Sequence, residues 1–230
     1  MSAVIVSLPA QALPLKGDFV YHRGVGSDPV YYRVHPIDYQ GIPAQEVVWE
    51  NRAMRARHVL RRSDGKPLYT LRENLQRHDS IEVIYARRQG EPTLYRQHSH
   101  TGVVERKIRA EGLRDLGSLP AILGAALLHQ DEIRFSALNY ADGSVYAFRA
   151  AVTGYRQMTT ASGLVRCALI EVRLDSWMAA LLPRVQLVVP LLQAGMPFIT
   201  YSGPALAGAG GTMSLHLSGI TADLAMLKTR

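Results

Sequence analysis

Most of the chain alternates between apolar and polar residues. Runs of this kind cover residues 29–37, 45–62, 67–74, 80–88, 93–100, 102–110, 131–140, 145–158, 164–175, 184–192, 195–203 and 211–220. A period of two is typical of strands with one buried face. The segment "SDGK" at 63–66 predicts a tight hairpin, because Asp-Gly tolerates a positive φ. The pattern therefore predicts successive antiparallel hairpins.

The alternation also predicts which side chains share a face. In residues 80–88, for example, Ile81, Val83 and Tyr85 fall on the same side. Hairpins with one apolar face build a curved antiparallel sheet. Such a sheet needs another layer over its apolar face.

One segment departs from this pattern, namely "SLPAILGAALLHQ" at 118–130. Ser118 is a suitable N-cap and Pro120 suits the first turn of a helix. The helix has no polar face, so it should be buried on more than one side. We expect a mainly β protein with one domain over residues 1–230. Its single, strongly curved antiparallel sheet forms a half-barrel with the short apolar helix on the concave face, and residues 1–28 form an N-terminal arm or first strand.

Composition narrows the class of protein. A hydrophobic content of 47% with 20% charged residues argues against disorder. The single cysteine, Cys167, cannot form an internal disulfide and lies among apolar neighbours, so we expect it to be inert. The N-terminal segment lacks the basic start of an export signal, and prolines interrupt the apolar region 177–199. We therefore expect a cytoplasmic protein without a membrane span.

The net charge of +7 raises the question of a nucleic-acid partner. The basic residues gather at 52–62 and 86–88, near the ends of the expected strands, where arginine normally faces solvent. No RNA-binding aromatic motif, zinc-finger spacing or helix-turn-helix pattern accompanies them. The sequence thus argues against nucleic acid.

A curved antiparallel sheet with an apolar helix on its concave side resembles the lipoprotein-carrier fold (LolA/LolB-like) and related uncharacterised bacterial families. The resemblance covers about residues 45–217 and is carried by the segments "SDGKPLY", "SLPAILGAALLHQ", "DEIRFSALNYADGSVYAFRAAVTG", "LVRCALIEVRLD" and "MPFITYSGP". Carriers of this shape hold acyl chains in a cavity, and an enzyme of violacein biosynthesis resembles the same fold without a cofactor. The resemblance implies a cavity for an apolar or aromatic small molecule and no cofactor.

Two pairs of residues are candidates for chemistry. His98 and His100 are two residues apart and thus on one strand face, as metal ligands or an acid/base pair would be, or as part of a solvated strand. No other histidine lies at a recognised ligand spacing, so we expect no metal. Arg149 and Glu171 interrupt apolar strands. They either point inward, where they could hold a carboxylate or polarise a carbonyl, or form an outward ion pair.

The remaining candidates would line the cavity or belong to the core. They are the strand aromatics and the large residues of the helix, namely Trp49, Tyr85, Tyr95, Ile122, Leu123, Leu127 and Tyr140.

Two functions fit these expectations. The first is a protein that binds a hydrophobic or aromatic small molecule between sheet and helix. The alternative is a cofactor-independent enzyme, of the cyclase or isomerase type, from a biosynthetic pathway, which would hold a reactive conformer in the same cavity. The enzyme requires polar side chains inside the cavity, so solvent-facing Arg149, Glu171 and histidines would count against it.

Overall fold

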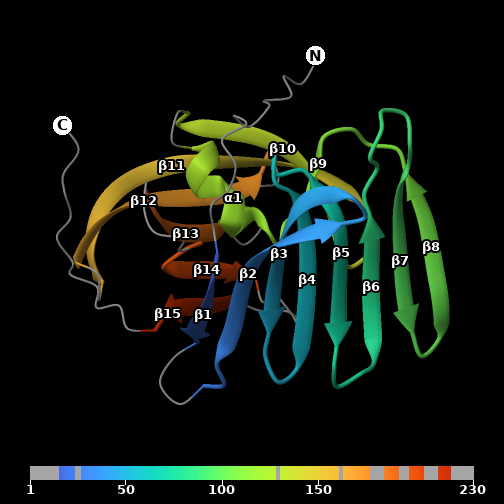
Figure 1. Cartoon of the computed structure of the whole chain (residues 1–230), viewed down its shortest axis with the longest axis horizontal. Helices are drawn as coiled ribbons and strands as arrows, with labels where there is room; N and C mark the ends of the chain where they lie inside the picture. Colours follow the sequence, from blue (N-terminus) through green and yellow to red (C-terminus); the bar gives the residue numbers. More distant parts are fainter. Residues whose placement is uncertain are drawn as a thin grey trace.

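The computed structural model of the chain describes residues 16–23, 27–127, 130–160, 163–176, 184–191, 197–204 and 212–218. Within them the protein is mainly β, with fifteen strands in one curved, unclosed sheet and one short helix (Figure 1). The prediction of a mainly β protein with a single curved sheet is confirmed.

The first eight strands are β1 Gly17–His22, β2 Val30–Tyr39, β3 Ile42–Glu50, β4 Met54–Arg61, β5 Pro67–Asn74, β6 Asp79–Ile84, β7 Thr93–Ser99 and β8 Gly102–Ile108. The later elements are β9 Leu113–Arg114, α1 Leu119–Ala126, β10 Glu132–Leu138, β11 Val145–Thr160, β12 Gly163–Leu174, β13 Val185–Pro190, β14 Thr200–Pro204 and β15 Thr212–Leu217.

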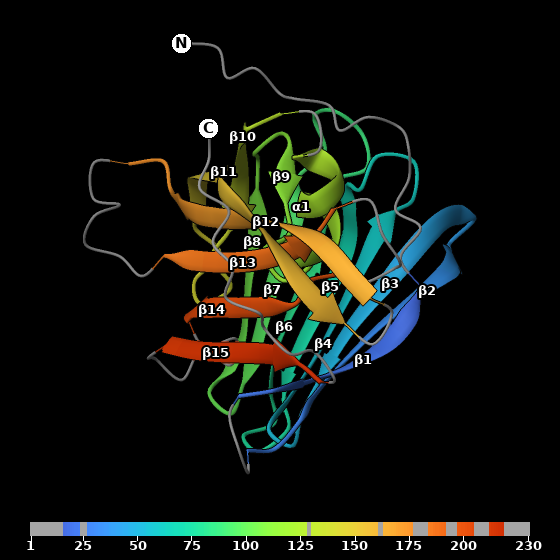
Figure 2. The same cartoon turned by 90° about the vertical axis from the view of Figure 1, so that its left-hand side faces the viewer.

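The strand order is β8-β7-β6-β5-β4-β3-β2-β1-β15-β14-β13-β12-β11-β10-β9. Described neighbours are antiparallel except β9 and β10, which run parallel. We call β2–β8 the first arm of the sheet and β9–β15 the second arm, with β1 between them. In Figure 1 strands β3–β8 run upright and β12–β15 run across the view, and Figure 2 shows the same change of direction from the side.

The turns explain how the hairpins form, and one of them corrects the sequence analysis. The hairpin predicted at 63–66 joins β4 and β5, with Gly65 at φ +62° and the Asp64 carboxylate accepting a hydrogen bond from the Lys66 amide. Residues 45–62, however, are not one strand. They contain the end of β3, a turn and β4, because Asn51 Oδ1 accepts hydrogen bonds from two amides ahead of it and closes that turn.

The largest group of buried side chains joins both arms of the sheet and α1. We call it the main core cluster, and its large members include Tyr21, Tyr32, Trp49, Leu60, Leu123, Ile170, Leu187, Phe198, Tyr201 and Leu215. Residues from strands on opposite sides of β1 therefore share one interior.

Cross-strand pairing places one set of side chains side by side on the interior face of the first arm. We call this set the inner row: Tyr32, Trp49, Ala56, Arg72 and Ile81, one each from β2 to β6. Neighbouring strands are about 4.8 Å apart, so the row spans the width of five strands. Four of its members are apolar or aromatic, and Arg72 is the exception.

Helix α1 is as apolar in its surroundings as its sequence predicts. Its large side chains are at most 5% exposed and belong to the main core cluster, namely Leu119, Ile122, Leu123 and, directly after the helix, Leu127. Pro120 lies in the first turn, as expected, but the hydroxyl of Ser118 does not cap the helix. The Ser118 Oγ instead donates to the backbone oxygen of Asp115, at 3.1 Å.

Some predictions concern residues outside the described ranges. Residues 1–15 of the expected N-terminal arm, positions 128–129 of the expected helix and most of the apolar region 177–199 fall there. Strand β1 lies within 1–28 and pairs with β2 and β15.

Candidate functional site

A group of buried polar side chains surrounds the start of α1. It draws on β4, β5 and the segments that follow β6, β9 and β10, and we call it the Asp115 cluster: His58, Thr70, Tyr85, Asp115, Ser118 and Tyr140. All six residues are buried, in a sheet whose other interior positions are mostly apolar.

One oxygen of the Asp115 carboxylate connects the helix to β4. His58 Nδ1 lies 2.8 Å from Asp115 Oδ2, and the two side chains are 1% and 0% exposed. The Ser118 amide donates to the same oxygen at 2.9 Å. The carboxylate thereby satisfies one of the free amides at the N-terminus of α1, a position where negative charge is favourable.

The other oxygen accepts hydrogen bonds from three hydroxyl groups. Thr70 Oγ1 donates to Asp115 Oδ1 at 2.9 Å, Tyr85 OH donates at 3.2 Å, and Tyr140 OH also donates. A carboxylate offers about four acceptor positions, so five donors leave none for a further group. Asp115 is therefore fully occupied inside the protein.

The charges of this cluster follow from its burial. Burial alone would raise the pKa of Asp115, but the charge of His58 and the hydrogen bonds from His58, Tyr140 and Ser118 hold that pKa well below its usual range. Burial, together with the nearby Asp115 charge, raises the pKa values of Tyr85 and Tyr140 well above 10. At neutral pH the cluster holds an ionised carboxylate among neutral phenols.

Gly117 fits tightly into the same cluster. Its amide donates to Tyr140 OH at 3.2 Å and its oxygen accepts from Trp49 Nε1 at 3.0 Å. A Cβ atom here would lie 2.2 Å from His58 Cε1. Because the Asp115 carboxylate is saturated and all six side chains of the cluster are buried, we interpret the Asp115 cluster as a structural link between α1 and the first arm.

Arg72 lies next to the Asp115 cluster but, unlike His58, forms no ion pair with Asp115. It is partly buried on the interior face of β5, two residues beyond Thr70. Its guanidinium carbon is 4.4 Å from the centre of the Tyr140 ring, and Nη2 is 3.7 Å from Met54 Sδ. Burial raises the pKa of Tyr201 on β14 to about 12, and the charge of Arg72 acts in the opposite direction, so Arg72 lies close enough to affect the second arm.

The aromatic part of the interior contains an unsatisfied polar atom. Tyr32 packs edge-on against Trp49, with ring centres 4.6 Å apart, and against Phe198 at 5.6 Å. Its side chain is fully buried, and its hydroxyl has no hydrogen-bond partner within the described chain. Tyr21, its neighbour at 6.1 Å, instead donates to the Phe198 backbone oxygen at 2.7 Å.

The predicted cavity-lining residues are all buried, in two groups. Trp49, Ile122, Leu123 and Leu127 belong to the main core cluster. Tyr85 and Tyr95 belong to a smaller cluster in the first arm with Val83, Leu113 and Leu138. Tyr140 contacts that second group, since Tyr95 OH donates to its backbone oxygen at 2.9 Å.

Arg149 and Glu171 lie on the sheet face opposite the main core cluster. Their strand neighbours Ala150, Ile170 and Val172 are members of that cluster, and alternation turns the two charged side chains the other way. Arg149 pairs with Glu132 at 3.3 Å, and Glu171 pairs with Arg184 at 3.3 Å and Arg173 at 3.8 Å. Arg149 and Glu171 therefore do not point inward, as a role inside the cavity would require.

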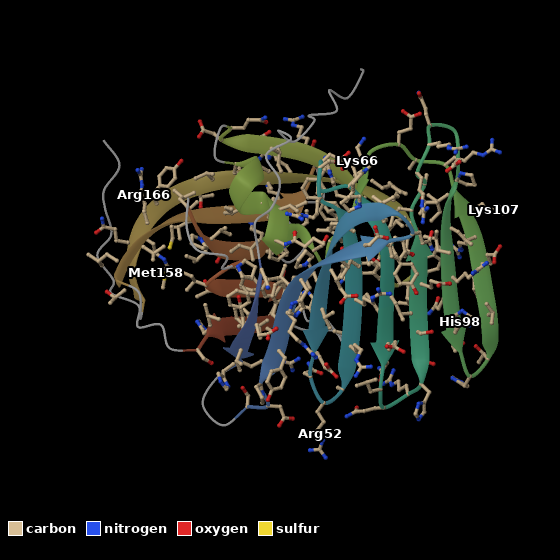
Figure 3. The ribbon with its side chains drawn as sticks, in the orientation of Figure 1. Arg52, Lys66, His98, Lys107, Met158 and Arg166 are labelled. Atoms are coloured by element: carbon tan, nitrogen blue, oxygen red, sulfur yellow. The ribbon has the colours of Figure 1, made fainter. Side chains whose placement is uncertain are left out.

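His98 and His100 are both exposed. Figure 3 shows His98 near one end of β7, far from α1. Within the described ranges no group of three histidine, cysteine or acidic side chains could hold a metal ion. Cys167 is buried, and burial raises the pKa of its thiol to about 11, so it remains protonated at neutral pH.

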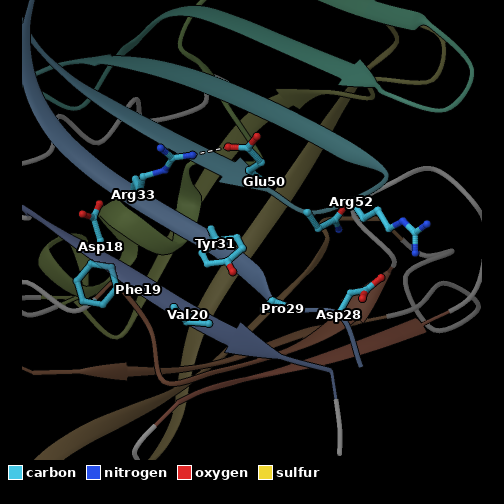
Figure 4. A pocket seen from close by; sticks show the side chains of 10 residues that line it. Asp18, Phe19, Val20, Asp28, Pro29, Tyr31, Arg33, Glu50 and Arg52 are labelled. Carbon is cyan, nitrogen blue, oxygen red and sulfur yellow. Dashed lines mark hydrogen bonds and ion pairs between the residues drawn. The ribbon is translucent and has the colours of Figure 1, made fainter. Parts of the chain in front are cut away.

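A groove of about 690 Å³ lies on the exterior face of β1–β3 (Figure 4). Figure 4 shows Tyr31 in the middle, the Arg33–Glu50 ion pair above it, and Asp28 with Arg52 at one end. Glu50 is also bound by Arg55 at 2.7 Å. Since its charged groups on β2 and β3 already pair with one another, the groove offers few charged groups that could bind a ligand.

Sequence reasoning did not single out Asp115, Arg72 or Tyr32. Asp115 lies three positions before the expected N-cap, outside the first turn in which acidic residues indicate the start of a helix. No local signal existed for Arg72, whose orientation depends on the register of β5 against β4 and β6.

No family model, no curated protein and no solved structure matches this chain. The likeness to lipoprotein carriers therefore stays a prediction. Among the residues that the structure describes, no helix has the length and apolar character needed to cross a membrane.

Proposed function

We propose that the protein binds an apolar or aromatic small molecule inside a half-barrel, with α1 on the concave face of the sheet. The shared interior supports this proposal, because side chains of both arms and of α1 meet in one cluster rich in aromatic rings. Apolar ligand sites have the same composition, with a few polar groups that fix the orientation of the ligand.

The Tyr32 hydroxyl is the observation that carries the proposal. A buried hydroxyl without a partner costs about 1–3 kcal/mol, and phenylalanine would fill the same space without that cost. Burial raises the pKa of Tyr32 above its ordinary value, so the group remains a donor. A bound molecule with an acceptor atom would satisfy it.

The alternative of a cofactor-independent enzyme receives less support. An enzyme of this kind requires inward Arg149, Glu171 or histidines, whereas these side chains lie on the exterior face or are exposed. The interior acid of the Asp115 cluster is saturated by its neighbours, and Nδ1 of the interior histidine, His58, is bound to that acid.

Binding can be tested with the neutral naphthyl ketone prodan, whose emission shifts in an apolar site and whose carbonyl can accept from Tyr32. We expect the full chain to bind it, and Tyr32→Phe to weaken binding about threefold to tenfold without loss of stability. Tyr21→Phe is the matched control, since it removes a satisfied hydroxyl. It should lower stability by about 0.5–1.5 kcal/mol and leave the affinity for prodan unchanged. A protein that takes up no prodan would overturn the proposal.

A further inference from the structure

Arg72 combines an interior position with an unpaired charge. Arginines on the exterior face of the same arm are neutralised by acidic partners, as Arg57 is by Glu46 and Arg96 is by Glu82 and Glu105. None of the ion pairs within the described ranges includes Arg72. A partly buried cation without a counter-charge is costly unless another group pairs with it.

The acidic groups near the interior do not serve as that partner. Asp115 is bound by His58 and four other donors. Asp79, two positions from Ile81 on the neighbouring strand, forms no ion pair with Arg72, and its Oδ1 is buried without a hydrogen bond. The sheet therefore presents a guanidinium to its interior and does not neutralise it.

The surroundings of Arg72 narrow the chemistry of a partner. The Tyr140 ring covers one face of the guanidinium, Met54 contacts one nitrogen, and Ala56 and Ile81 flank it in the inner row. Among the described residues, only Met54 contacts a nitrogen of the guanidinium, so most of its five N–H donors have no acceptor there. The planar fork of an arginine matches a carboxylate with two parallel hydrogen bonds. A phosphate dianion would require a second cation, and neither Met54, Ala56, Ile81 nor Tyr140 supplies one.

We propose that Arg72 binds the carboxylate of a small amphipathic acid whose apolar part lies among the aromatic side chains of the inner row and the aliphatic side chains of α1. This inference rests on the proposed function and names the class of ligand. The proposal also explains why a small residue, Ala56, lies between Trp49 and Arg72 in the inner row, because its short side chain leaves space for the ligand.

The test uses prodan as reporter and two competitors with the same chain length, dodecanoate and dodecanol, at neutral pH. Dodecanoate should displace prodan from the full chain at about a tenfold lower concentration than dodecanol. Arg72→Gln should abolish that difference while prodan, which is neutral, still binds. Arg72→Lys should keep part of the preference, because it retains the charge but not the planar fork.

Arg166→Gln is the matched control. Arg166 is exposed and lies over the Tyr155 ring at 5.0 Å. Figure 3 shows it on the opposite side of the molecule from His98 on β7. Like Arg72→Gln, the Arg166→Gln substitution removes one positive charge and one contact with an aromatic ring. It should nevertheless leave the preference for dodecanoate intact. If prodan binds but the two competitors are equivalent, or if Arg166→Gln abolishes the preference as Arg72→Gln does, the inference is wrong and the binding function stands. If prodan does not bind, both fail. Circular dichroism of each variant establishes that it is folded.

Discussion

His58 Nδ1 lies 2.8 Å from Asp115 Oδ2, with both side chains out of contact with solvent. A histidine and a carboxylate in this setting depend on each other, because each offsets part of the cost of burying the other. The pair also joins β4 to the residues that begin α1. Asp115 therefore links the start of α1 to the first arm, in addition to the apolar packing of the helix in the main core cluster.

Asp115→Asn should lower the free energy of unfolding by about 3–5 kcal/mol, since it leaves His58 without its charged acceptor in a closed site. Urea unfolding of the full chain measures this. Asp175→Asn is the control, because Asp175 pairs with Arg134 at 3.5 Å on the surface. Its loss should be at most about 1 kcal/mol. Equal losses in the two variants would contradict a structural role for Asp115.

The contribution of the His58–Asp115 pair to stability should also depend on pH in the acid range. An unfolded aspartate binds a proton as the pH falls below about 4, whereas the lowered pKa of Asp115 keeps it ionised in the folded protein. The stability that Asp115 contributes is therefore complete above that pH and is lost below it, by up to about 1.4 kcal/mol per pH unit. The difference in unfolding free energy between wild type and Asp115→Asn should shrink toward about pH 3. A constant difference across this range would refute the linkage.

The sequence was sufficient for features that depend on neighbouring residues. The alternation at 80–88, the Asp-Gly turn at 63–66 and the apolar helix after Ser118 are all local patterns, and the structure contains a strand, a hairpin and a helix there. The turn at Asn51 was missed because the run around it continues the apolar and polar alternation of both strands.

The interior site depends on pairings that no local pattern contains. Thr70 and Tyr85 are 45 and 30 residues from Asp115, whose carboxylate both of them contact. In β5 the simple rule for faces also fails, since polar Thr70 and Arg72 point inward while Leu71 lies on the exterior face opposite Arg57. Only the registers of β4–β6 reveal that orientation.

Gly117→Ala should disturb the pair through sterics alone. The added Cβ would lie 2.2 Å from His58 Cε1 and 2.5 Å from Nε2, and the ring cannot move away without breaking its contact with Asp115. We expect a loss of about 1–3 kcal/mol or more in urea unfolding. In Gly154→Ala the new Cβ would meet Leu169 Cδ1 at an ordinary 3.6 Å, so this control should stay close to wild type. Equal stability of the two variants would show that the space beside His58 is not restricted.

Gly124 decides whether α1 is a fixed part of the core or an element that shifts to admit a ligand. Glycine weakens a helix by up to about 1 kcal/mol relative to alanine, which suits a mobile element. A Cβ at this position, however, would lie 2.8 Å from Val189 Cγ1 on β13, so the glycine also allows close packing. Val189 is buried and β-branched, and its side chain has little freedom to rotate away.

If packing is the reason for the glycine, Gly124→Ala alone should be destabilising by about 1–3 kcal/mol. The double variant Gly124→Ala, Val189→Ala should then be more stable than the sum of the two single losses predicts, by about 1 kcal/mol or more. Urea unfolding of all four proteins gives this coupling, and prodan titrations of the same four show whether binding follows it. Additive losses would remove the packing explanation. A more stable Gly124→Ala protein with weakened prodan binding would instead identify the glycine as the means by which α1 moves.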